Sequence, residues 1–256
     1  MKKFLVILAV SVLSCGLAGS AMALSFGDSS DGKSLQQVFN EFTVGGNSSV
    51  NTLKDYLEYD EFWKQTASMQ SAVTMVVEIA GFKDTNVFGI YDAANSNNRV
   101  ELFSGIASPG IANGGMAVFT ILDNGDVYVN YQKVATTFSG AMFGFYLDSS
   151  ARNGGGLFFS DTSLNQDGFD HMAAYQGLDK DMVRLNSNAP ANGLLWTSNE
   201  YILAWEDLYG GGDSDYQDFV AMVESVDPAV PEPSTVLLLG AGVLGMVAFG
   251  RKYVKK

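Results

Sequence analysis

The spacing of apolar and polar residues changes once along the body of the chain, which we define as residues 24–229. From residue 34 to residue 42, apolar residues recur every three or four positions, a period typical of an amphipathic helix. The apolar face of this helix is formed by Leu35, Val38, Phe39 and Phe42. A second short helix is expected from Ser49 to Leu57. We therefore predict a helical lead-in over residues 24–70, packed on the rest of the body.

After this lead-in, the apolar runs become short and turn residues separate them, which is typical of strands. Asp123-Asn124-Gly125-Asp126 lies between two such runs and predicts a two-residue hairpin with a type I′ turn. So many short strands favour a jelly-roll-like β-sandwich over residues 71–229. The predicted strands are Val73–Ile79, Val87–Tyr91, Val100–Phe103, Ala117–Leu122, Val127–Tyr131, Phe138–Leu147, Gly156–Phe159, Met172–Tyr175, Tyr201–Trp205 and Phe219–Val223.

The N-terminal end has the three parts of a secretory signal peptide. Lys2 and Lys3 precede the apolar stretch 4–13, and Ala21-Met22-Ala23 offers small residues for cleavage. We therefore expect residues 1–23 to be removed, with Ala21 and Ala23 defining the cleavage site. The single cysteine, Cys15, falls in this segment. Disulfide bonds and thiolate chemistry are then not expected in the mature protein.

The C-terminal end combines a proline motif, an apolar run and a basic tail. Pro231-Glu232-Pro233 precedes an apolar stretch, residues 235–250, and the basic residues Arg251 and Lys252 follow it. As a helix rising about 1.5 Å per residue, this stretch barely crosses a hydrocarbon core of roughly 30 Å, with its basic end in the cytoplasm. An ordinary C-terminal membrane anchor is the alternative interpretation. Either interpretation places the body outside the cytoplasm.

This order of features resembles the PEP-CTERM sorting signal. The resemblance implies that an exosortase-type enzyme recognises and removes residues 230–256 during export, with the helix 235–250 as a transient membrane anchor. We therefore expect an exported protein of the cell surface or the extracellular space.

The charge of the chain is strongly acidic outside its two ends. The whole chain has a net charge of −13, but residues 24–234 contain nine basic and 28 acidic residues, a net charge of −19. Such a charge disfavours nucleic acid as a partner and favours cations. The alternative is that the acidity only keeps an extracellular protein soluble.

The acidic residues are densest in the segment 205–219. Five carboxylates fall within thirteen residues, and no Lys or Arg occurs between Arg184 and Arg251. Two unit charges about 4 Å apart repel by roughly 4 kcal/mol at an effective dielectric of 20, so converging carboxylates need a cation. Three glycines, 210–212, allow the loop to turn its oxygen atoms inward, and hard oxygen donors suit Ca²⁺. The predicted calcium ligands are Glu206, Asp207, Asp213, Asp215 and Asp218.

This segment resembles the bacterial domain of unknown function 4114. The shared pattern is an aromatic residue, Glu-Asp-Leu, glycines and then Asp-x-Asp-Tyr-x-Asp, and an upstream part of the family matches residues 159–172. The resemblance spans residues 139–224, with Gln166 in place of a frequent proline. It implies an exported β domain with an acidic motif. Less certain additional ligands, which also suit ordinary turns, are Asp161, Asn165, Asp167 and Asp170.

Two other functions remain open beside calcium binding. A secreted glycosidase would use two carboxylates, such as Glu206 opposite Asp215 or Asp218. A carbohydrate-binding module would use exposed aromatic residues such as Tyr209 and Tyr216. The single histidine, His171, is expected to be structural. We favour a calcium-stabilised, structural or adhesive protein of the cell surface or of the polysaccharide matrix of a biofilm, without catalysis, whose partners are extracellular polysaccharides or matrix proteins.

Overall fold

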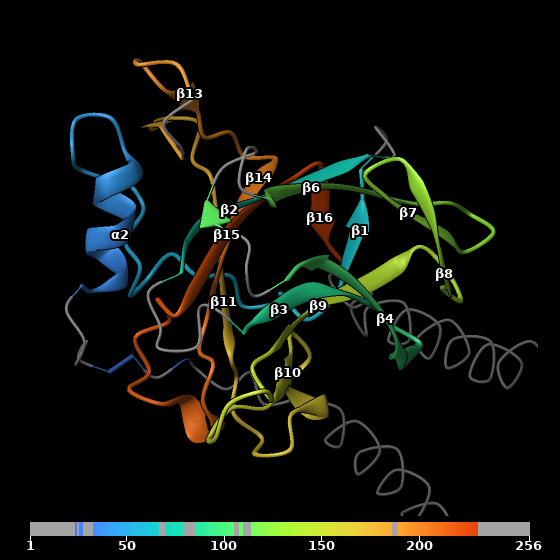
Figure 1. The fold of residues 1–256 in the computed structure, drawn as a ribbon. Helices are drawn as coiled ribbons and strands as arrows, with labels where there is room; N and C mark the ends of the chain where they lie inside the picture. Colours follow the sequence, from blue (N-terminus) through green and yellow to red (C-terminus); the bar gives the residue numbers. More distant parts are fainter. Residues whose placement is uncertain are drawn as a thin grey trace, which may run out of the picture.

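The computed structural model describes residues 24, 26–27, 33–66, 70–78, 85–104, 108–109, 114–185 and 189–229 (Figure 1). Within them the protein is mainly β, with one α-helix. The helical elements are α2 (Leu35–Phe42) and the 3₁₀ turns η2 (Thr162–Leu164) and η3 (Tyr209–Gly211). The strands are β1 (Trp63–Gln65), β2 (Ser71–Glu78), β3 (Val87–Asp92), β4 (Asn95–Phe103), β5 (Ser108–Pro109), β6 (Gly114–Ile121), β7 (Asp126–Val129), β8 (Gln132–Thr137), β9 (Met142–Asp148), β10 (Leu157–Phe159), β11 (Met172–Gln176), β12 (Met182–Val183), β13 (Leu194–Leu195), β14 (Glu200–Trp205), β15 (Phe219–Glu224) and β16 (Val226–Pro228).

The strands form two large sheets and one small hairpin. The first sheet has the order β16-β1-β9-β3-β4, with β10 also paired to β9. The second sheet has the order β11-β14-β15-β2-β6-β7-β8, and the short β5 pairs with β6 in parallel. All other pairs are antiparallel, including the separate hairpin of β12 and β13. In the second sheet, the consecutive strands β14 and β15 are neighbours in full register, from Glu200 opposite Glu224 to Trp205 opposite Phe219.

The core lies between the two sheets and is rich in aromatic residues. Phe88 of the first sheet stacks on Phe219 of the second, with ring centroids 4.8 Å apart. Trp63 of the first sheet meets Tyr201 of the second edge to face at 5.0 Å. Strand side chains alternate between faces, so every second residue of β14 and β15 enters this core. These inward residues are Tyr201, Leu203, Trp205, Phe219, Ala221 and Val223.

A third layer covers part of the outer face of the second sheet. Helix α2 begins with a capping box between Ser34 and Gln37, and its apolar face packs on outward residues of β11, β14 and β15. The predicted helix and its apolar face are thus confirmed. The hairpin β12–β13 joins the same cluster through Val183. The second apolar cluster contains Leu35, Val38, Phe39, Phe42, Val50, Ala173, Tyr175, Val183, Trp196, Ile202, Ala204, Tyr216, Val220 and Met222.

The helix predicted from Ser49 to Leu57 does not form, and this prediction was wrong. The Asn51 side chain accepts a hydrogen bond from the backbone N–H of Leu53 at 3.0 Å, and Asp55 accepts one from the N–H of Asn51 at 2.7 Å. These local bonds stabilise a turn in place of a helix. The segment 24–70 also contributes strand β1, which pairs with β9 and β16. The lead-in is therefore part of the sheet structure as well as a cover for it.

The predicted hairpin at residues 123–126 is present, but its turn is of another type. Gly125 has a positive φ of 84°, whereas Asn124 is not among the residues with positive φ. A type I′ turn needs positive φ at both central residues, so the predicted turn type was wrong. Two consecutive residues with positive φ do occur at Asn130 and Tyr131, between β7 and β8. The predicted strand Val127–Tyr131 therefore ends earlier, at Val129.

Both predicted terminal signals, residues 1–23 and 230–256, lie outside the described residues, as does the predicted membrane helix 235–250. Over the part of the chain that the structure describes, no helix has the length and apolar character needed to cross a membrane.

Candidate metal centre

The acidic segment is the loop of the β14–β15 hairpin. Glu206 follows the last residue of β14, and Asp218 precedes the first residue of β15. A second loop, residues 160–171, connects β10 to β11, the strand paired with β14 on its other side. Both loops therefore lie at the same end of the second sheet, at the bottom of Figure 1. We call this end the acidic end.

The acidic loop follows a path that ordinary residues rarely adopt. Gly210, Gly211 and Gly212 all have positive φ, and so do Ser214 and Tyr216. A Cβ at residue 211 would lie only 2.1 Å from the ring of Phe169. A Cβ at residue 212 would lie 2.9 Å from Oε2 of Glu206. The glycines thus allow the loop to close onto the upstream loop and onto the Glu206 carboxylate.

Three of the five predicted ligands converge. Glu206, Asp213 and Asp215 each offer one carboxylate oxygen, and these three oxygens lie within 4.8 Å of one another. Glu206 is completely buried. Its Oε1 accepts a hydrogen bond from the backbone N–H of Tyr216 at 2.6 Å. Its Oε2 is buried and accepts no hydrogen bond from the residues that the structure describes. A buried, charged oxygen of this kind requires a proton or a cation.

The other two predicted ligands, Asp207 and Asp218, form hydrogen bonds at the two ends of the loop. Asp218 accepts a hydrogen bond from the backbone N–H of Asp207 at 3.1 Å, which ties the start of the loop to its end. The side-chain amide of Asn86 donates to Asp207 at 3.0 Å. All three side chains are buried. Asp207 and Asp218 are therefore beside the three converging carboxylates, with structural bonds of their own.

Burial makes the acidic loop attract positive charge. Burial, together with the charges of Asp215 and Asp213, raises the pKa of Glu206 to about 8. Burial, followed by the charges of Asp207 and Glu206, raises the pKa of Asp218 to about 9. In each case the protein disfavours the free carboxylate. A bound cation removes this penalty without a proton.

The upstream loop positions the acidic loop through hydrogen bonds. Asp167 accepts a bond from the backbone N–H of Gly210 at 2.7 Å, and the same oxygen lies 3.0 Å from Nε2 of His171. Asp161 caps η2 by accepting from Ser163. Asn165 donates to the carbonyls of Phe159 and Phe169. Asp161, Asn165 and Asp167 lie outside the three-carboxylate group; their side chains hold the loops in place.

His171 links the two loops from a fully buried position. Its Nδ1 lies 3.0 Å from the carbonyl oxygen of Glu206, and its ring stacks on Phe158 with centroids 3.6 Å apart. Burial lowers the pKa of His171, whereas the carboxylate of Asp167 raises it. With both ring nitrogens engaged and no exposed surface, His171 has the structural position expected for it, directly before β11.

The remaining upstream residue, Asp170, belongs to a different acidic pair. Burial raises the pKa of Asp170 to about 7. Burial and the charge of Asp170 also raise the pKa of Asp60 well above its usual value. Asp60 accepts a hydrogen bond from the backbone N–H of Ala174 at 3.1 Å. Sequence analysis missed Asp60 because it stands 110 residues from its partner, outside any motif.

The aromatic residues of the loop have different surroundings. Tyr209 is exposed, and its hydroxyl donates to Gln166 at 3.1 Å. Tyr216 is completely buried and donates to the carbonyl of Asp170 at 2.7 Å. A carbohydrate-binding surface would need exposed aromatic residues, and of these two tyrosines only Tyr209 is exposed.

The fold and the site define a β protein with a buried acidic hairpin loop. Residues 111–226 match the family described as domain of unknown function (DUF4114), and residues 229–252 match the PEP-CTERM protein-sorting motif. The chain therefore carries a DUF4114 domain followed by a PEP-CTERM motif, as the sequence predicted, and the domain begins earlier than residue 139. No curated protein and no solved structure matches the chain. The PEP-CTERM motif identifies an exported protein that an exosortase sorts.

Proposed function

We propose that the acidic loop binds Ca²⁺ and that the protein is a structural or adhesive component of the cell surface or of an extracellular polysaccharide matrix. Two observations carry this proposal: carboxylate oxygens of Glu206, Asp213 and Asp215 converge, and the buried Oε2 of Glu206 accepts no hydrogen bond from the described residues. In this proposal the jelly-roll-like sandwich is the scaffold. The helix 235–250 anchors the protein only until processing.

The donor set supports calcium over transition metals. All three converging groups are carboxylates, and hard oxygen donors select Ca²⁺ or Mg²⁺. The single histidine is occupied by Asp167 and by the Glu206 carbonyl, so it is no ligand. Calcium tolerates irregular geometry, whereas magnesium demands an octahedron and retains several waters. A loop whose irregular backbone presents Glu206, Asp213 and Asp215 suits the larger and more tolerant ion.

The proposed role of the ion is to hold the hairpin loop in its unusual conformation. Three carboxylates that repel one another oppose the path required by the positive φ values at residues 210–216. A divalent ion turns this repulsion into attraction and adds stability by mass action. Exported proteins meet calcium outside the cell, so the loop would become rigid after export.

Burial argues against the glycosidase alternative. A glycosidase needs two carboxylates that contact the sugar, but Glu206 is completely buried and Asp218 is 7% exposed. The carbohydrate-binding alternative loses Tyr216, which belongs to the second apolar cluster. Of the two tyrosines, only Tyr209 is exposed.

The test is a calcium titration of the melting temperature of the exported protein. At a calcium concentration 100 times Kd, the expected stabilisation is about 2.7 kcal/mol, or roughly 5–10 °C for a domain of this size. The double variant Asp213→Asn with Asp215→Asn should abolish this shift and, in EDTA, should be at least as stable as the natural protein. Asp123→Asn, in an exposed hairpin loop, is the matched control and should retain the shift. A melting temperature indifferent to both calcium and EDTA contradicts the proposal.

A further inference from the structure

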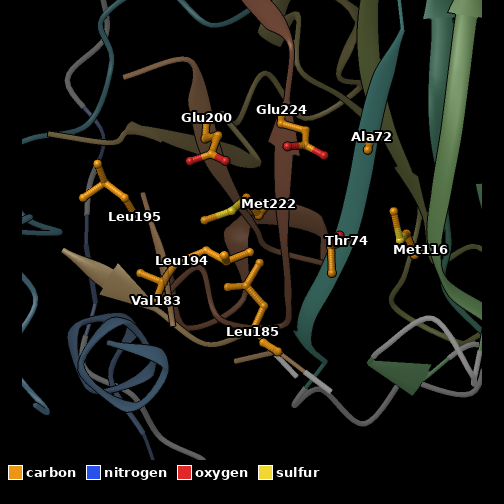
Figure 2. A pocket seen from close by; sticks show the side chains of 11 residues that line it. Ala72, Thr74, Met116, Val183, Leu185, Leu194, Leu195, Glu200, Met222 and Glu224 are labelled. Carbon is orange, nitrogen blue, oxygen red and sulfur yellow. The ribbon is translucent and has the colours of Figure 1, made fainter. Parts of the chain in front are cut away.

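A second acidic site lies on the outer face of the second sheet, where helix α2 does not cover it. A cavity of about 200 Å³ lies there, and Figure 2 shows the side chains that line it. Its floor consists of outward side chains of four neighbouring strands, including Thr74 of β2, Met116 of β6 and Met222 of β15. One wall is the hairpin β12–β13 with Val183 and Leu194. Apart from its two glutamates, the cavity is mostly apolar.

Glu200 and Glu224 form the acidic side of this cavity. They are directly opposite each other on β14 and β15, and both carboxylates are at the same side of the cavity in Figure 2. Like charges in this arrangement destabilise a sheet. Partial burial, followed by the charge of Glu200, raises the pKa of Glu224. Among the described residues, no Lys or Arg forms an ion pair with either glutamate.

The rim of the cavity is unusually apolar for an exposed surface. Leu194 is 61% exposed and Leu195 is 41% exposed. They stand on the short hairpin that forms the wall, and both line the cavity. Exposed apolar residues grouped around a cavity are typical of a contact surface. The site thus combines two carboxylates, which form no ion pair with a described residue, with apolar walls and an apolar rim.

The size of the cavity favours one side chain over a whole small molecule. Cavities for small ligands usually measure about 300–1,000 Å³, and this one is smaller. An arginine side chain has an apolar stem and a flat guanidinium with five donors, which can bridge two carboxylates. Arginine is also a residue type that commonly anchors protein interfaces in a pocket.

We propose that this cavity binds an arginine side chain of a partner protein, flanked by apolar residues that pack on Leu194 and Leu195. The guanidinium lies between Glu200 and Glu224, and the stem of the arginine lies against Met222. The net charge of −19 over residues 24–234 attracts such a basic segment over a distance. This site is separate from the acidic loop, because β14 and β15 place the two at opposite ends.

The experiment uses the exported protein and a fluorescein-labelled peptide in which one arginine stands between two leucines. Fluorescence anisotropy should show saturable binding in 50 mM NaCl, equally in calcium and in EDTA. Replacing the arginine by citrulline, which keeps the shape and removes the charge, should weaken binding at least tenfold. Glu224→Gln should do the same, and Leu194→Ser should weaken binding severalfold. Glu101→Gln, an exposed glutamate of β4, is the matched control and should bind the peptide like the natural protein.

Several outcomes would overturn this proposal. Equal binding of the citrulline peptide, or an unchanged affinity of a Glu224→Gln variant with a normal melting temperature, removes the role of the glutamates. Competition by n-propylguanidine at the same concentration as the peptide identifies a small molecule as the occupant. Self-association that Glu224→Gln abolishes identifies a second copy of the chain. Loss of peptide binding in EDTA would make the site dependent on the acidic loop.

Discussion

The two ends of the β14–β15 hairpin carry acidic residues in opposite surroundings. At the acidic end, Glu206 is completely buried, and its neighbours are other carboxylates and backbone N–H groups. At the other end, Glu200 is half-buried and Glu224 is exposed, and the cavity beside them is lined by apolar side chains of β15 and of the hairpin β12–β13. The same two strands, β14 and β15, carry both acidic sites. The difference therefore lies in the side chains that the flanking segments place around the carboxylates.

Because their surroundings differ, the two acidic sites favour different kinds of cation. Oxygen atoms that converge on one point without apolar neighbours favour a small, hard ion, which needs several oxygen ligands. Two carboxylates at the edge of an apolar cavity favour an organic cation, whose stem is stabilised by contact with apolar walls. The count of acidic residues alone would not distinguish the two ends. Burial and neighbouring atoms distinguish them.

The largest expected effect comes from Gly211→Ala at the acidic end. The new Cβ would lie 2.1 Å from the ring of Phe169, at a φ of 77° that disfavours alanine. We expect a loss of about 3 kcal/mol in the free energy of unfolding, together with loss of the calcium response. Urea denaturation with and without calcium measures both. Peptide binding at the Glu200–Glu224 cavity should persist, because the strands between the two ends remain.

Gly210→Ala is the matched control for this variant. Residue 210 has nearly the same φ, 73°, but a Cβ there meets nothing within 4 Å. The expected loss is therefore only the conformational cost, about 1 kcal/mol, with the calcium response retained. Equal losses in the two variants would mean that contact between the glycine loop and Phe169 does not matter for the acidic end.

The second prediction concerns the pH dependence of stability that arises from the buried carboxyl groups of Asp60 and Asp170. Asp60 and Asp170 both have raised pKa values in the folded protein, the latter about 7. Their contribution to stability is therefore fully present below the unfolded pKa of about 3.8 and is lost as the pH rises through about 7. In EDTA, Asp60→Asn should remove the part of this loss that Asp60 contributes and so stabilise the protein at pH 8, whereas Asp170, whose pKa is raised chiefly by burial, keeps its own part. Urea midpoints between pH 4 and pH 8 measure it.

Asp123→Asn again provides the control, since an exposed carboxylate has little effect on the pH profile. If the Asp60→Asn profile is parallel to that of the natural protein, the Asp60–Asp170 pair does not determine the pH dependence. Calcium should shift the stability of Asp60→Asn as much as that of the natural protein, because Asp60 is not among the converging groups.

The regular parts of this fold were the predictable ones. The ten apolar runs marked strands that the structure contains, because alternation of inward and outward side chains leaves a visible period. Strands such as β8, with the polar sequence from Gln132 to Thr137, leave no such period and were missed. Short strands such as β1 and β16 form only through pairing with distant partners, so their sequences carry little signal.

The candidate site was predictable in composition but not in geometry. The dense carboxylates and glycines marked the loop, yet nothing in the sequence separates Glu206, Asp213 and Asp215 from Asp207 and Asp218. The difference depends on the folded loop, in which the N–H of Asp207 donates to Asp218 and the N–H of Tyr216 donates to Glu206. The Glu200–Glu224 pair was also invisible, because 24 residues separate the two and only strand register places them face to face. Calcium itself stays a prediction.

The smallest expected change in the free energy of unfolding is at the Glu200–Glu224 end, in contrast to the large change expected at the acidic end. Neutralising either glutamate removes repulsion between partly exposed groups, so Glu224→Gln should stabilise the protein by only about 0.3–0.5 kcal/mol at low salt. Glu200→Gln keeps an acceptor for the N–H of Thr197, which now donates to Glu200 at 2.6 Å. The double variant should gain no more than either single variant, since one neutral partner already ends the repulsion. Urea denaturation in 20 mM and 500 mM NaCl measures the effect, which salt should erase. Additive gains would show that the two carboxylates do not interact, and the cavity would then lack the paired charge that an arginine needs.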